Sequence, residues 1–91
     1  MDEKPNMEKF PCLAMAYKAC EKGATVPAVL NAANEICVEA FLNERIAFIE
    51  IPRFIDKVMS DHKVIDHPSL SDILEADQWA REETLKVIRE K

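Results

Sequence analysis

The chain has 91 residues, of which 48% are hydrophobic and 32% charged, a balance typical of one folded domain rather than a disordered tail. Its net charge of −5 comes from 17 acidic and 12 basic side chains, and no segment concentrates lysine and arginine, so nucleic acid and anionic membranes are disfavoured as partners. The single glycine favours helices and disfavours phosphate-binding loops.

The N-terminal segment is polar and interrupted by Pro5. We expect residues 1–10 to be a linker or arm from a missing N-terminal part and residues 11–91 to form a helical bundle domain. Pro11 is suited to open a helix, whose apolar stripe recurs at intervals of three and four through Leu13, Ala16, Tyr17 and Cys20. Gly23 is the expected end of this helix, because glycine adopts the left-handed conformation without steric cost.

A second helix is predicted up to Leu42, with Thr25 and Pro27 as its start signals. Its polar residues fall on one narrow stripe, so the rest of its circumference is apolar and we expect it to be the central helix. The residues predicted to lie in the core are Leu30, Ala33, Cys37, Ala40 and Phe41.

Residues 46–49 are apolar but too few for a helix, so an extended connector is expected there. Ile51 and Pro52 then open a third helix that runs through Met59 and ends at Ser60 and Asp61. Its predicted core residues are Phe54, Ile55, Val58 and Met59. Residues 62–68 contain a proline and lack periodicity, which predicts a loop.

A last helix is predicted after the loop, with Ser69 or Ser71 as its cap. The pattern allows a break near Ala76 and Asp77. The apolar contacts of this helix are expected from Ile73, Leu74, Trp79, Leu85, Val87 and Ile88. The predicted fold is therefore all-α, a small antiparallel bundle of about four helices.

Two histidines and two aspartates in and beside the loop suggest a metal site, since imidazole and carboxylate together bind zinc, iron or manganese. These residues are Asp61, His62, Asp66 and His67. The two histidines are five apart and near a proline, whereas ligand pairs on one helix face are three or four apart. Solvated loop histidines are the preferred interpretation.

Asn31, Asn34 and Glu35 form the most unusual polar group, because they lie on an otherwise apolar helix. A ligand site is one interpretation. We prefer the other, in which the amides satisfy backbone groups at a partly buried seam, because no nucleophile, base or glycine loop accompanies them.

The remaining candidates have structural interpretations. Cys12, Cys20 and Cys37 include no Cys-x-x-Cys pair, which favours buried thiols in a reducing compartment, and we expect a cytoplasmic location. The two serines resemble caps rather than nucleophiles. Core packing is expected of the aromatic residues Phe41, Phe48, Phe54 and Trp79. No catalytic, cofactor-binding or metal-binding residue is predicted in this chain.

Several segments resemble a known family. They are Glu-Lys-Phe-Pro-Cys-Leu-Ala at 8–14, Val-Pro-Ala-Val-Leu-Asn-Ala-Ala-Asn-Glu at 26–35, and the closing stretch at 69–81 that ends in Trp-Ala-Arg. In register, they are similar to the C-terminal region of 1-deoxy-D-xylulose 5-phosphate reductoisomerases. The similarity covers nearly the whole chain.

The resemblance implies an enzyme of isoprenoid synthesis by the methylerythritol phosphate route, usually a homodimer, that uses NADPH and a divalent metal, Mg or Mn. It also implies that the nucleotide-binding and catalytic domains precede this region in the same polypeptide. The family's nucleotide loop and Asp-Ser-Glu metal motif have no counterpart here. This chain alone is therefore expected to be inactive and structural. The alternative is an independent helical adaptor that binds a partner through an exposed apolar groove.

Overall fold

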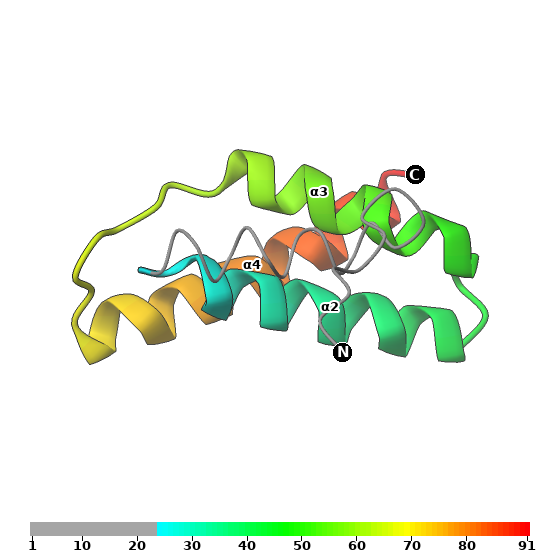
Figure 1. Cartoon of the computed structure of the whole chain (residues 1–91). Coiled ribbons are helices and arrows are strands. Elements are labelled where there is room, and N and C mark those ends of the chain that lie inside the picture. The colour runs from blue at the N-terminus through cyan, green and yellow to red at the C-terminus, as the bar shows by residue number, and fades with distance from the viewer. Residues whose placement is uncertain (1–23) are drawn as a thin grey trace, which may run out of the picture.

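Three helices pack together in the computed structural model, which describes residues 24–91 (Figure 1). They are α2 (Val26–Leu42), α3 (Ile51–Asp61) and α4 (Leu70–Arg89), with a short 3-10 turn, η1 (Phe48–Glu50), before α3. No strand occurs in this part of the chain, so the all-α prediction is confirmed. The predicted first helix, with Gly23 as its end, lies outside the described residues.

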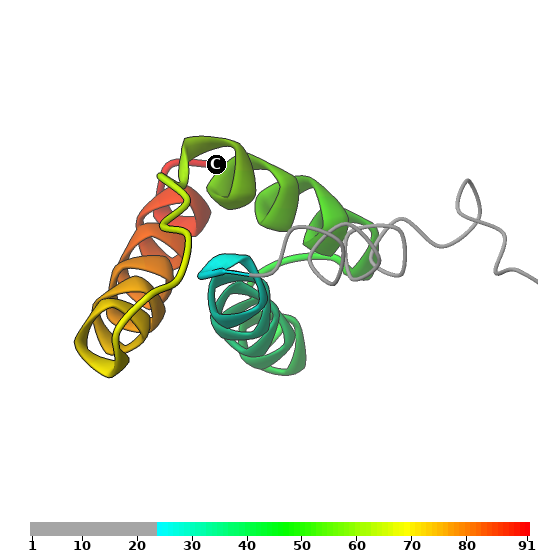
Figure 2. The same cartoon turned by 60° about the vertical axis from the view of Figure 1, so that its left-hand side comes forward.

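Successive helices run in opposite directions, as predicted for an antiparallel bundle (Figure 1). Because α2 and α4 are separated by one reversal at each end of α3, they run the same way. Figure 2 shows the three helices arranged around a common interior. Helix α2 contacts both α3 and α4, but α4 also contacts both of the other helices, so the prediction of one central helix is not confirmed by the described residues.

The start of α2 differs from the prediction in one respect. Pro27 lies in the first turn, as expected, but the side chain of Thr25 at the N-cap position makes no capping hydrogen bond. Thr25 is fully buried and its hydroxyl contacts the loop after α3 instead. A threonine before a helix therefore serves here to fasten a distant segment.

The end of α2 is a Schellman motif made without glycine. The amide of Arg45 donates to the carbonyl of Ala40 over 2.9 Å, and that of Glu44 donates to the carbonyl of Phe41 over 3.0 Å. Glu44 takes the left-handed conformation, with φ of 59°. The expected extended connector is wrong beyond Ala47, because Phe48–Glu50 form η1, while Ile46 is buried in the core.

Helix α4 begins with a reciprocal cap and is continuous. The amide of Asp72 donates to Oγ of Ser69 over 3.1 Å, and the amide of Ser69 donates to Oδ2 of Asp72 over 2.9 Å. Ser69 is thus the cap, and Ser71 lies in the first turn. The break that the pattern allowed near Ala76 and Asp77 is absent, since both of these residues are helical.

The core confirms the prediction for α3 but only part of it for the other helices. Phe54, Ile55 and Val58 are buried as expected, with Met59 packed at the edge. Phe41, predicted in the core, is 37% exposed. On α4 the buried residues are mostly small ones at four-residue spacing, whereas three predicted contacts are exposed: Ile73, Leu74 and Leu85. Small side chains let α4 approach α2 closely, and larger ones beside that face remain outside.

Candidate functional site

The amide group predicted on α2 does not satisfy backbone groups. Asn31, Asn34 and Glu35 are all exposed rather than partly buried. Nδ2 of Asn31 donates to Oε2 of Glu35 over 3.3 Å, so the amide supports a carboxylate on the same helix. The prediction of a seam is wrong, because this stripe of α2 faces outward.

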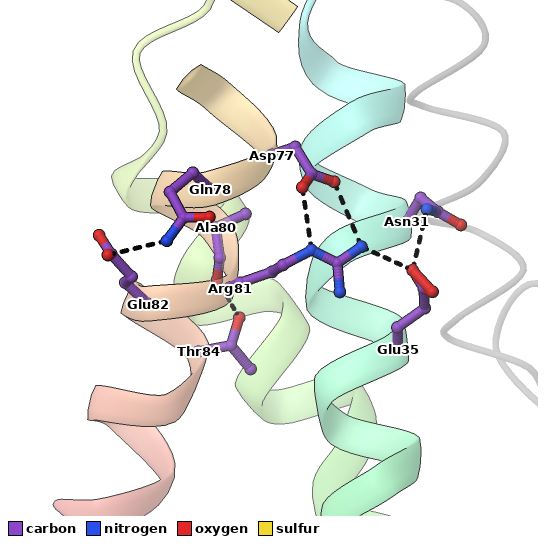
Figure 3. A network of polar contacts seen from close by, with 8 residues as sticks. All are labelled: Asn31, Glu35, Asp77, Gln78, Ala80, Arg81, Glu82 and Thr84. Atoms are coloured by element: carbon purple, nitrogen blue, oxygen red, sulfur yellow. Dashed lines mark hydrogen bonds and ion pairs between the residues drawn. The ribbon is translucent and has the colours of Figure 1, made fainter. Parts of the chain in front are cut away.

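The carboxylate of Glu35 belongs to a polar network that joins α2 to α4 (Figure 3). Nη2 of Arg81 lies 2.8 Å from Oε2 of Glu35, and Nε of Arg81 lies 2.9 Å from Oδ2 of Asp77. The hydrogen bond to Asp77 raises the pKa of Arg81 most, and the hydrogen bond to Glu35 raises it further. A guanidinium held between two carboxylates links two helices, and its positive charge is already balanced within the domain. The sequence does not predict this network because Glu35 and Arg81 are 46 positions apart.

His62, one of the candidate metal ligands, contacts two groups of the domain, the hydroxyl of Thr25 and the ring of Trp79. Its Nε2 atom lies 2.8 Å from Oγ1 of Thr25, which also accepts a hydrogen bond from the amide of Ile65 over 3.1 Å. The imidazole ring lies 5.6 Å from the ring of Trp79, measured between centroids. Burial lowers the pKa of His62 from its ordinary value of 6.5. The neutral ring is therefore favoured, and it pins the loop to the start of α2.

The structure does not gather the candidate metal ligands. Asp61 pairs with Lys57 across one helical turn, with 3.5 Å between Nζ and Oδ2. Asp66 and His67 are exposed. Among residues 24–91, no group of three or more His, Cys, Asp or Glu side chains is placed to hold a metal ion.

The thiol and aromatic candidates divide between core and surface. Cys37 is buried in the core, as predicted, while Cys12 and Cys20 lie outside the described residues. Phe54 is buried and Trp79 packs against the core. Phe41 and Phe48 contradict the prediction, because they lie on the surface with their rings edge to face and 5.5 Å between centroids.

Two surface clusters of large apolar side chains were not predicted. The first, here called the α2–η1 patch, consists of Phe41, Leu42, Phe48 and Ile49. The second, the α4 patch, lies at the first turns of that helix and consists of Leu70, Ile73 and Leu74. The turn between α2 and α3 and the start of α4 lie at opposite ends of the bundle (Figure 1). Periodicity alone cannot separate such residues from core residues, since both obey the same helical spacing.

The comparison with protein families decides which family these helices represent. A family model described as the DXP reductoisomerase C-terminal domain matches residues 3–83. The chain belongs to this family. The resemblance found in the sequence is thereby confirmed over most of the chain.

Curated reductoisomerases agree with the family match. The 1-deoxy-D-xylulose 5-phosphate reductoisomerase of Synechococcus sp. (strain JA-2-3B'a(2-13)) is 52% identical over 86 residues, which is 94% of this chain and 22% of that protein. The enzyme of Desulfosudis oleivorans is 54% identical over 78 residues, covering 86% of this chain and 20% of that protein. The chain thus spans about a fifth of the length of the DXP reductoisomerases it matches.

A solved reductoisomerase shares the fold. The structure of the Zymomonas mobilis enzyme in complex with NADPH superposes with a TM-score of 0.84 at 36% identity. The similarity covers 94% of this chain and 23% of that one. None of the helices described here is long and apolar enough to cross a membrane.

Proposed function

We propose that this chain is the non-catalytic C-terminal structural domain of a 1-deoxy-D-xylulose 5-phosphate reductoisomerase. The complete enzyme would convert 1-deoxy-D-xylulose 5-phosphate to 2-C-methyl-D-erythritol 4-phosphate with NADPH in the cytoplasm, as a homodimer. The observation that carries this proposal is the family match over residues 3–83, combined with the small share of each relative that the chain covers. In this proposal residues 1–10 are the linker and residues 11–91 the domain.

The polar side chains of the described residues have structural roles that agree with this proposal. Arg81 bridges two helices, His62 fastens a loop, and Ser69 caps a helix. These contacts join helices and a loop within the bundle, as expected of a structural domain. The exposed apolar patches would also suit the independent adaptor, but the family match over most of the chain favours the reductoisomerase domain.

The described residues do not fit the cofactors that the family resemblance implies. Residues 24–91 provide no cluster suited to a divalent metal ion. The chain's single glycine precedes this part, so no glycine-rich loop is available in it to approach the pyrophosphate of NADPH. We therefore assign no step of the reaction to this domain, and place NADPH and the Mg or Mn ion in the preceding domains of the enzyme.

Turnover measurements test this proposal. The 91-residue chain, shown to be helical by circular dichroism, is mixed with 1-deoxy-D-xylulose 5-phosphate, NADPH and Mg²⁺, and NADPH oxidation is followed. The intact Synechococcus reductoisomerase and a version lacking its matched C-terminal region are assayed in parallel. We expect turnover by the intact relative only. Turnover by the 91-residue chain, or full activity of the shortened relative, would overturn the proposal.

A further inference from the structure

The α2–η1 patch presents its apolar side chains in a cluster. Leu42, Phe48 and Ile49 are 71%, 70% and 79% exposed, and Phe48 also packs edge to face on Phe41. Side chains of this size normally lose most of their exposed area in a folded protein, because removing apolar area from water is favourable. A cluster of them on adjacent elements is typical of a surface that another part of a protein covers.

The backbone beneath the patch is held firmly. The Schellman motif fixes the end of α2, and Oε1 of Glu50 accepts a hydrogen bond from the amide of Ala47 over 2.7 Å. Nζ of Lys91 lies 2.8 Å from the same Oε1 atom, so the end of the chain also holds η1 in place. A surface whose backbone is already fixed loses less conformational entropy when it docks than a surface on a flexible loop.

The length of the relatives indicates what covers this patch. The chain matches the C-terminal 22% or so of the curated reductoisomerases, and the remaining polypeptide precedes that region in them. In an enzyme of this kind, the nearest large surface available to the domain belongs to its own preceding domains. A second copy is the weaker candidate, because two chains of net charge −5 repel each other.

We propose that the α2–η1 patch is the surface by which this domain docks onto the preceding, catalytic part of a reductoisomerase polypeptide. This inference rests on the proposed function. The partner surface is accordingly apolar, and docking holds the bundle against the catalytic part across the linker.

A hybrid enzyme tests the docking surface. The matched C-terminal region of the Synechococcus reductoisomerase is replaced with this chain, and limited proteolysis at the linker and NADPH oxidation are both measured. The test variant carries Phe48→Gln and Ile49→Gln, and the matched control carries Leu70→Gln and Leu74→Gln in the α4 patch. The control side chains are 72% and 60% exposed, so both variants remove two exposed apolar residues.

We expect the test variant to be cleaved at the linker at least roughly tenfold faster than the unmodified hybrid, because it loses the burial of two large apolar side chains. The control variant should be cleaved at the unmodified rate. Both variants of the isolated 91-residue chain should unfold at the same temperature as the parent chain, which excludes misfolding as the cause.

The alternative outcomes separate the two proposals. An inactive unmodified hybrid would overturn the proposed function and the docking surface with it. An active hybrid in which both variants are cleaved at equal rates would overturn the docking surface alone. Dimerisation of the isolated chain that the Phe48 and Ile49 substitutions abolish, with the hybrid unaffected, would identify a second copy as the occupant and also overturn it.

Discussion

Oγ1 of Thr25 lies 2.8 Å from Nε2 of His62, 37 positions further along the chain. The same oxygen accepts a hydrogen bond from the amide of Ile65, so one buried hydroxyl joins the start of α2 to the loop that leads into α4. The threonine and the histidine each have an ordinary explanation in sequence, as a cap and as a loop residue. Their contact gives both a role in holding the three helices together.

Stability should depend on pH through His62. Burial lowers the pKa of His62 in the folded protein, while in the unfolded chain it stays near 6.5. The unfolded chain therefore binds more protons below that pH, so the histidine's contribution to stability is fully present above about pH 6.5 and is lost as the pH falls through and below it. Urea unfolding, followed by the fluorescence of Trp79, measures this dependence.

His62→Asn should remove this part of the pH dependence. His67→Asn is the matched control, because His67 is exposed in the same loop and asparagine tolerates its positive φ of 52°. The control should keep the pH dependence of the parent chain. Equal pH profiles for the parent chain and His62→Asn would contradict the role assigned to the buried ring.

The fold could be predicted from the sequence further than the surface could. Pro27, Pro52 and Ser69 mark helix starts locally, so the helices were placed nearly correctly. Which apolar residues face the interior depends on how closely helices approach. Ala76 and Ala80 are buried while Leu74 is exposed, and a hydrophobic period cannot distinguish these cases.

The polar contacts were beyond prediction for a different reason. Arg81 meets Asp77 one turn away, which spacing suggests, but it also meets Glu35 on another helix. That second contact requires the packing of α2 on α4 to be known first. The sequence singles out Asn31 and Glu35 as unusual, but it does not show that Glu35 pairs with a guanidinium on α4.

Glu44→Gly should stabilise the domain by about 1 kcal/mol. Glu44 has a φ of 59° at the end of α2, where a side chain is sterically unfavourable and glycine is preferred. Asn43→Gly is the control, because Asn43 has a φ of −91° and gains nothing from glycine. Chemical denaturation of the three proteins measures the difference. A less stable Glu44→Gly variant would show that this side chain makes a favourable contact that outweighs its strain.

Truncation to alanine should destabilise the domain strongly at Ile55 and hardly at all at Ile49. Ile55 is fully buried in the core, so Ile55→Ala should reduce the free energy of unfolding by about 3 kcal/mol. Ile49 is 79% exposed, so Ile49→Ala should change it by less than about 0.5 kcal/mol in the isolated chain. Urea titration measures both values. A large loss for Ile49→Ala would mean that the α2–η1 patch is covered within this chain.

The bridge between α2 and α4 should be sensitive to salt. Glu35→Gln removes one carboxylate from Arg81, and the melting temperature should fall slightly at low ionic strength. Because exposed ion pairs are screened, the difference from the parent chain should vanish in high salt. Glu39→Gln, which removes an exposed charge from the same helix, is the control and should not lower the melting temperature. A loss for Glu35→Gln that persists in high salt would indicate a contribution from packing rather than charge.

The activity of the unmodified hybrid enzyme is the most direct test of the central claim, that this chain is the structural C-terminal domain of a reductoisomerase. The Synechococcus enzyme without its matched C-terminal region and the hybrid that carries this chain in its place are compared for NADPH oxidation with 1-deoxy-D-xylulose 5-phosphate. We predict that the hybrid regains turnover that the shortened enzyme lacks. A soluble hybrid with no more activity than the shortened enzyme would contradict the claim.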